Sequence, residues 1–180
     1  MTKQVSKELI NSWEWLDAFC LTQRGICELA CGQHAIVVVQ INQFEEIKER
    51  LTRSQLNELL HKIEKQMETY ALEDTIVAKY NEYTYVVVLH YLNSRDEIEE
   101  ICSEIEAAFS EDKEISKYNI SVTLGAAECH HDPDSGYKCA ARLAMEALQE
   151  AKEKNKDFIL APDTLRPHPL ALKMKEARRK

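Results

Sequence analysis

The sequence predicts an α+β domain of the ferredoxin-like kind, with helices flanking a central, mostly antiparallel sheet. Residues 35–41, AIVVVQI, form a nearly unbroken apolar run of strand length, which suits a central strand covered on both faces. Within residues 75–91, the β-rich runs TIVAKY and YTYVVVLHY close around the polar pair Asn81–Glu82, a pattern typical of a hairpin. Helical periodicity on both sides gives the order β-α-β-β-α-β, followed by another helix and strand. This split βαβ order predicts an antiparallel sheet with helices on one side, plus the additional helix and strand.

Two helices are expected between the first strand and the hairpin. Asn42 with Glu45 three residues later predicts a capping box for a short helix, and Thr52 with Gln55 predicts a second box. The second helix has apolar residues at helical spacing, which are Leu56, Leu59, Leu60, Ile63, Met67 and Tyr70.

The elements after the hairpin follow the same logic. Ser94 with Glu97 predicts a third capping box, and alternating apolar residues over 120–126 predict a half-buried strand. A further helix begins near residue 133 and stops at Asn155, a residue that tolerates the left-handed conformation. Small residues on its buried face predict close packing: Ala140, Ala144, Ala147 and Ala151. Residues 157–161, DFILA, are expected to form the last strand.

Length and charge restrict the class of protein. A chain of 180 residues fits one domain, over residues 34–161, with a helical extension at 1–33 and a basic tail at 162–180. The net charge of −8, without a long basic stripe, argues against a nucleic-acid-binding domain. No apolar run reaches about 18 residues and no signal peptide is recognisable, so we expect a cytoplasmic protein without a membrane span.

The cysteines do not predict a disulfide framework or a metal centre. Six are present without a CxxC pair, and in a reducing compartment they are expected to be small buried side chains. The run Cys129-His130-His131-Asp132-Pro133-Asp134, with Cys139, has the residue types of a zinc site. Adjacent histidines rarely face one ion, however, and we expect no metal and no cofactor.

Residues 17–160 resemble a GGDEF domain, which has the nucleotidyl cyclase palm fold of bacterial diguanylate cyclases. That family's first strand ends in a segment of the type Asp-Ile-Asp-x-Phe-Lys, where AIVVVQINQFEEIK stands here. Its signature Arg-Tyr-Gly-Gly-Asp-Glu-Phe corresponds to KYNEYTY, residues 79–85. Its Ser-Ile-Gly strand corresponds to residues 123–125, and its closing helix to AMEALQEAKEKNKD, residues 144–157. The common order and spacing of these motifs carry the resemblance.

The resemblance implies metal-binding carboxylates on the first strand and the hairpin, and this chain has none at those positions. Gln40 stands at the first-strand carboxylate, with Asn42 two residues later. Tyr83 and Thr84 replace the Asp and Glu of the signature, and Tyr85 replaces its Phe. An amide and a hydroxyl cannot offset the charge of Mg²⁺ beside a triphosphate, so we expect no cyclase chemistry.

The turn and the nucleotide contacts implied by the resemblance also differ. Asn81 and Glu82 replace two glycines, and Glu82 would be strained at positive φ, so a differently shaped turn is expected. The family's guanine-reading Asn corresponds to Lys48, and its partner Asp corresponds to Asn57. The two phosphate contacts correspond to Lys152 and Lys156. The product-inhibition motif Arg-x-x-Asp corresponds to the segment from Leu72 to Thr75.

We therefore expect a catalytically inactive GGDEF-like domain that acts as a regulatory or scaffold module, by binding a protein partner or by homodimerising. One alternative is a non-catalytic receptor for GTP or cyclic di-GMP, with weak nucleotide binding through Lys152 and Lys156. Another is an active cyclase rebuilt around Glu82 and an upstream glutamate. The upstream candidates are Glu45, Glu46 and Glu49, for which an exposed acidic helix face is the simpler interpretation.

Overall fold

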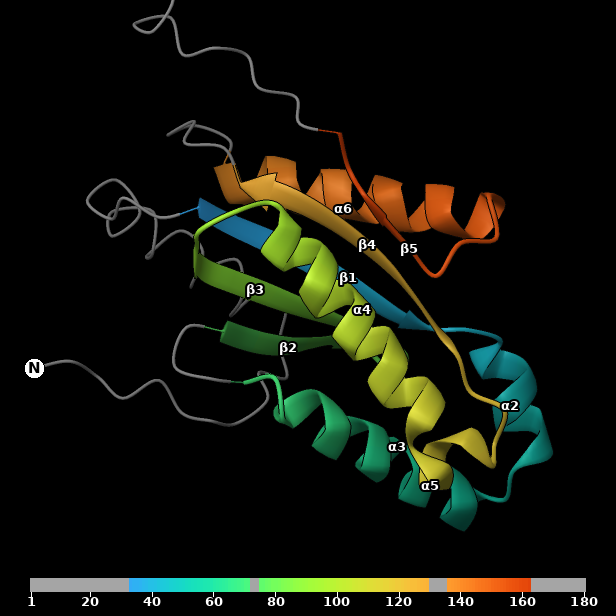
Figure 1. The fold of residues 1–180 in the computed structure, drawn as a ribbon. Coiled ribbons are helices and arrows are strands. Elements are labelled where there is room, and N and C mark those ends of the chain that lie inside the picture. Colours follow the sequence, from blue (N-terminus) through green and yellow to red (C-terminus); the bar gives the residue numbers. More distant parts are fainter. Residues whose placement is uncertain (1–32, 72–74, 130–135, 163–180) are drawn as a thin grey trace, which may run out of the picture.

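The structure, a computed structural model, describes residues 33–71, 75–129 and 136–162. A five-stranded sheet in the order β2-β3-β1-β4-β5 forms its centre (Figure 1). All neighbouring strands are antiparallel except β4 and β5, which are parallel, so the predicted mostly antiparallel sheet is confirmed. The strands are β1 (Gln33–Ile41), β2 (Thr75–Asn81), β3 (Thr84–Leu92), β4 (Val122–Cys129) and β5 (Phe158–Leu160).

Helices cover both faces of this sheet, as the unbroken apolar run of β1 predicted for a central strand. Alternate residues of β1 belong to two separate apolar cores, with Val37 in one and Val38 in the other. Four helices pack on the first core, and α6 (Gly136–Glu153) packs on the second. The four are α2 (Phe44–Arg50), α3 (Arg53–Glu68), α4 (Asp96–Glu111) and α5 (Lys113–Ser116).

Helix α6 lies unusually close to β4 because Gly125 has no side chain. A Cβ atom at Gly125 would lie 2.2 Å from the main-chain oxygen of Ala144 and 2.2 Å from the main-chain nitrogen of Leu148. The predicted small-residue stripe completes this contact, since Ala144 and Ala151 are fully buried. Close packing fixes α6 over the sheet and therefore fixes the side chains that its last turns carry.

The capping predictions have mixed outcomes. The Thr52–Gln55 capping box of α3 is confirmed. The box at Asn42 is wrong, because Gln43 is the N-cap residue of α2, with φ of 51° and no side-chain cap. Asn42 instead joins the ends of two strands, as its Nδ2 donates to Ser121 Oγ and its Oδ1 accepts from Thr123 Oγ1, both over 3.0 Å.

Helix α4 also begins differently from the prediction. Its N-cap is Arg95 rather than Ser94, without a side-chain cap. The Glu97 carboxylate instead accepts hydrogen bonds from the backbone nitrogen and the side-chain amide of Asn93. The predicted left-handed stop after α6 is confirmed, because Asn155 has φ of 53°.

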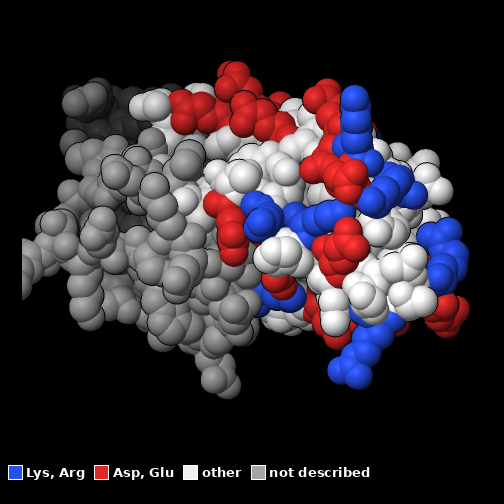
Figure 2. Space-filling view, turned by 90° about the horizontal axis from the view of Figure 1, so that it is seen from below, with Lys and Arg blue, Asp and Glu red and all other residues white. Residues whose placement is uncertain are grey.

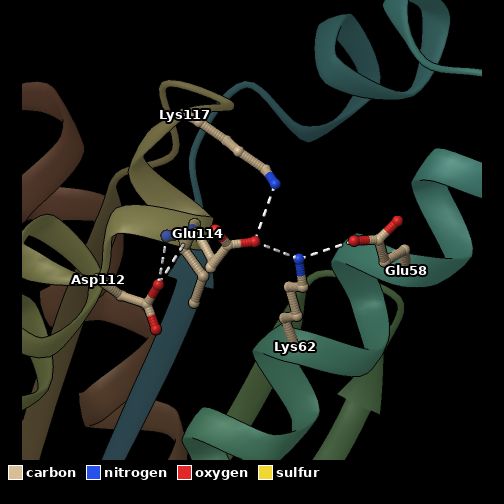
Figure 3. A network of polar contacts seen from close by, with 6 residues as sticks. Glu58, Lys62, Asp112, Glu114 and Lys117 are labelled. Atoms are coloured by element: carbon tan, nitrogen blue, oxygen red, sulfur yellow. Dashed lines mark hydrogen bonds and ion pairs between the residues drawn. The ribbon is translucent and has the colours of Figure 1, made fainter.

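A surface network joins α3 to α5 (Figure 3). Lys62 Nζ lies 2.7 Å from carboxylate oxygens of both Glu58 and Glu114, and Lys117 Nζ lies 2.9 Å from Glu114. The Asp112 carboxylate caps α5 by accepting from two backbone N–H groups. These two lysines hold the pKa of Glu114 at about 2, through hydrogen bonds first and charge second. Exposed pairs of this kind contribute little stability each, so the network orients α5 more than it stabilises the fold.

Some predictions fall outside the described residues. These are the helical extension before Gln33, the tail beyond Pro162, the segment 72–74 and the run 130–135 with its candidate zinc ligands. No helix in the described part of the chain has the length and apolar character needed to cross a membrane.

Candidate functional site

Three side chains from three elements meet at one end of the sheet. Gln40, near the end of β1, pairs with Thr84, the first residue of β3, and its Nε2 donates to Thr84 Oγ1 over 3.1 Å. Lys152, on the last turn of α6, donates from Nζ to Oε1 of Gln40, although 112 positions separate the two residues. The Gln40 amide thus donates to one partner and accepts from the other. We call Gln40, Thr84 and Lys152 the strand-end triad.

The triad is neutral apart from one ammonium. Burial lowers the pKa of Lys152, and no charged group is a further cause. No ion pair joins Lys152 to a carboxylate in the described part of the chain, and Thr84 is only 1% exposed. The described residues also contain no group of three His, Cys, Asp or Glu side chains placed to hold a metal ion. Chemically, the triad offers a cation and hydrogen bonds, and it offers no anionic oxygen to a divalent ion.

The hairpin turn next to the triad is unstrained. Asn81 pairs with Thr84 after a register shift, which places Glu82 and Tyr83 at the centre of the turn. The Asn81 Oδ1 accepts from the backbone N–H of Tyr83 over 3.0 Å. None of these residues has positive φ, so the turn differs from a glycine turn without the strain considered for Glu82.

The turn is fastened to α2 by two contacts. Lys48 Nζ lies 2.8 Å from Glu82 Oε2, and the ring of Tyr83 stacks on Phe44 with centroids 5.3 Å apart. The Lys48 ammonium lowers the pKa of the Glu82 carboxyl by hydrogen bonding and charge. Glu82 therefore faces a cation. The structure gives it no contact with the upstream glutamates that a rebuilt metal site would require.

Tyr85 belongs to the core rather than to the site. Its side chain is fully buried in the core under α3, and its hydroxyl has no hydrogen-bond partner among the residues that the structure describes. Burial raises the pKa of that hydroxyl well above its ordinary value. The observed contacts therefore give Tyr85 a role in packing.

Comparisons with known proteins agree with this architecture. Residues 23–157 match the family described as diguanylate cyclase, GGDEF domain. The chain belongs to the GGDEF family. Diguanylate cyclases of bacterial cyclic di-GMP signalling are its usual members, and a comparison with curated proteins gave no match.

Solved GGDEF structures share the fold at low sequence identity. The GGDEF domain of YfiN (TpbB) from Pseudomonas aeruginosa is 20% identical with a TM-score of 0.72, over 87% of this chain and 98% of that one. The active GGEEF domain of a diguanylate cyclase from Vibrio cholerae is 16% identical with a TM-score of 0.71, over 87% and 100%. The diguanylate cyclase SiaD of P. aeruginosa, solved in complex with its activator SiaC, is 14% identical with a TM-score of 0.69, over 82% and 57%.

Within this GGDEF domain, the predicted site residues fall into separate groups. Lys152 joins Gln40, whereas Lys48 is engaged by Glu82. Asn57 is exposed on α3, and Lys156 is exposed just after the left-handed Asn155. In the part of the chain that the structure describes, no hydrogen bond joins the side chains of Asn57 or Lys156 to the strand-end triad.

Two features were missed by the sequence reasoning. The contact between Lys48 and Glu82 spans 34 positions and leaves no periodic signal. The contact of Lys152 with Gln40 was also missed, although both positions were singled out separately. The resemblance placed Gln40 and Lys152 at two separate family positions. It did not indicate that the Lys152 ammonium would donate a hydrogen bond to a neutral amide at the first-strand position.

Proposed function

We propose that this GGDEF domain is catalytically inactive and acts as a regulatory or scaffold module, through protein contacts or as a homodimer, in bacterial cyclic di-GMP signalling. The observation that carries the proposal is the strand-end triad. At the two positions where the resemblance places metal-binding carboxylates, Gln40 and Thr84 bond to each other and to the Lys152 ammonium.

The strand-end triad is unfavourable for binding a divalent cation for two reasons. Mg²⁺ requires oxygen ligands, preferably charged, and a neutral amide and hydroxyl supply little of the electrostatic attraction that binds it. The Lys152 ammonium also lies within hydrogen-bonding distance of the amide oxygen that would have to turn to the metal. Like charges a few ångströms apart repel, more so where water is partly excluded.

The cyclase assay is a direct test. The full chain is incubated with GTP and Mg²⁺, and separately with Mn²⁺, and the products are separated by chromatography. The active GGEEF domain of V. cholerae serves as the positive control under the same conditions. We expect no cyclic di-GMP above the background without protein. Product formation that rises with protein concentration would disprove the inactive assignment.

A receptor for GTP or cyclic di-GMP is the second candidate, and the lone ammonium favours it. Lys152 has no carboxylate partner among the described residues, so a phosphate oxygen could replace the Gln40 amide without breaking an ion pair. Calorimetry with GTP and with cyclic di-GMP, with and without Mg²⁺, tests this candidate. Binding that weakens in Lys152→Gln but not in the exposed control Lys154→Gln would support it. Absence of heat at sub-millimolar ligand would exclude it.

The scaffold role has its own test. Static light scattering during gel filtration distinguishes a monomer from a homodimer, and affinity purification of the full chain followed by mass spectrometry identifies protein partners. SiaD, a family member solved with its activator SiaC, is an example of a GGDEF protein in a protein complex. A chain that remains monomeric and retains no partner above a matched control protein would contradict the scaffold role.

A further inference from the structure

Helix α4 presents a strongly acidic outer face. It contains no lysine or arginine, and no basic residue lies in its last turn. Acidic side chains gather along the upper edge of the described surface in Figure 2, the side nearest the viewer in Figure 1, where α4 lies. The acidic residues of α4 are Asp96, Glu97, Glu99, Glu100, Glu104, Glu106 and Glu111.

A hollow of about 480 Å³ lies along this face and has an apolar patch supplied by β5. Phe158 is half-buried there. None of the carboxylates of the hollow has an ion-pair partner within the described residues, so the surface is both anionic and partly apolar. The lining residues are Asp96, Glu99, Glu100, Ser103, Glu104 and Phe158. A segment that suits it would carry several cations together with aliphatic side chains.

The chain's own C-terminal segment, residues 163–180, has that composition. It contains six basic and two acidic residues. Ala161, two residues before this segment, lies beside the start of α4, because the guanidinium of Arg95, the residue preceding α4, donates to the backbone oxygen of Ala161. Its aliphatic residues are Leu165, Leu170, Leu172 and Met174, and its basic residues are Arg166, Lys173, Lys175, Arg178, Arg179 and Lys180.

The reach of the segment is sufficient. A helix of 16 residues, the length of α4, is about 24 Å long at 1.5 Å per residue. An extended segment of 18 residues spans up to about 60 Å. Because the segment is tethered next to the start of α4, its effective concentration at the acidic face reaches the millimolar range, so weak contacts suffice.

We propose that residues 163–180 dock on the acidic face of α4 in the same chain. The basic side chains pair with the α4 carboxylates, and the aliphatic side chains contact Phe158. Each exposed pair is weak, so docking depends on several pairs acting together and is sensitive to salt. This inference is independent of the proposed function, because it concerns neither the strand-end triad nor a nucleotide.

Zero-length cross-linking of the full wild-type chain tests the contact directly. A carbodiimide joins a carboxylate to an amine that touches it, and mass spectrometry identifies the joined residues. We expect the tail lysines to link to α4 carboxylates, with a yield that falls at least about five-fold in 1 M NaCl, where the Debye length is about 3 Å. Links distributed evenly over other acidic surfaces, or none at α4, would disprove the proposal.

Mixing ¹⁴N- and ¹⁵N-labelled chains separates two kinds of docking. Links within one chain join peptides of the same isotope only, which is the expected result. Mixed-isotope links would show that a second copy provides the tail, and the proposal of docking within one chain would then be wrong.

Amide spectra of the tail provide a readout that does not depend on cross-linking chemistry. An α4 variant loses three carboxylates, and an α2 variant with the same change of charge serves as the matched control. The α4 variant should shift the amides of residues 173–180 towards their positions in 1 M NaCl, and the α2 variant should not. Equal shifts in both variants, or none in the α4 variant, would overturn the inference. The substitutions are Glu99→Gln, Glu100→Gln and Glu104→Gln in α4, and Glu45→Gln, Glu46→Gln and Glu49→Gln in α2.

Discussion

Substitution of Gly125 by alanine is expected to separate α6 from the sheet. The added Cβ would lie 2.2 Å from main-chain atoms of α6, whereas ordinary contacts begin at 3.4 Å. The helix would therefore have to move outwards by about 1.2 Å, since the crowded atoms are backbone and cannot rotate away. A radial gap of about 0.5–1 Å already forfeits a quarter to a half of the dispersion energy between two surfaces.

The expected loss in free energy of unfolding is about 3 kcal/mol or more, at or above the upper end of ordinary overpacking. Alanine is also favoured over glycine in a strand by roughly 0.5–1 kcal/mol, which offsets only a small part. Urea denaturation followed by circular dichroism measures the change, and an m-value of about 1–3 kcal/mol/M converts it into a midpoint lower by at least about 1 M. A loss below about 1 kcal/mol would refute the reasoning.

The double variant Gly125→Ala/Leu148→Ala identifies which atoms are crowded. The close contacts at residue 148 involve its backbone nitrogen and Cα, and shortening the side chain leaves both in place. We therefore expect the losses in free energy of unfolding of the two single variants to add in the double variant, so that Leu148→Ala restores none of the stability lost in Gly125→Ala. Restored stability in the double variant would show that side-chain crowding decides the distance between α6 and the sheet, contrary to the argument.

Three further predictions concern single positions. Thr52→Ala should lower the free energy of unfolding by about 0.5–2 kcal/mol because the capping box of α3 is lost, and Thr52→Ser should largely preserve it; urea denaturation checks both. Asn155→Ala should lower the melting temperature of the domain, whereas Asn155→Gly should not, because φ of Asn155 is 53° and glycine adopts positive φ more readily than alanine. Thermal denaturation of both variants measures this. Lys62 and Lys117 hold the pKa of Glu114 at about 2, below its ordinary value of 4.5. The ion pairs between Glu114 and these lysines therefore stabilise the folded state above about pH 4.5, and this stabilisation is lost as the pH falls towards 2. An NMR titration of the Glu114 carboxyl in wild type and Lys62→Gln tests this, and an unchanged pKa in the variant would contradict it.

The sequence predicted the elements well because their signals are local. The apolar runs of β1 and β3, the helical periodicities and the small-residue stripe of α6 all report which face is buried. The capping prediction at Asn42 failed because of tertiary contacts. Asn42 bonds instead to residues 79 and 81 positions away, and a capping motif cannot reveal that a stronger tertiary partner competes for the same side chain.

The candidate site was predicted only as separate positions. The resemblance singled out Gln40, Thr84 and Lys152, but their mutual hydrogen bonds depend on how α6 crosses the sheet. That crossing is set by Gly125, whose role in close packing is a matter of three-dimensional distance. Similarly, the salt bridge of Lys48 with Glu82 follows from the approach of α2 to the hairpin, which no periodicity encodes.

The strand-end triad shows how two neutral side chains and one ammonium hold the strand ends of this fold together. A carboxylate at the position of Thr84, which is 1% exposed, would be costly to bury unless a cation compensated for it. Threonine and glutamine remove that cost, because each satisfies the other through a hydrogen bond and the lysine ammonium satisfies the remaining amide oxygen. The contact of Gly125 with α6 is made by backbone and small apolar groups and is independent of charge. Packing therefore depends on Gly125 and the small-residue stripe of α6, whereas the strand ends are joined by the neutral pair Gln40 and Thr84 together with the Lys152 ammonium.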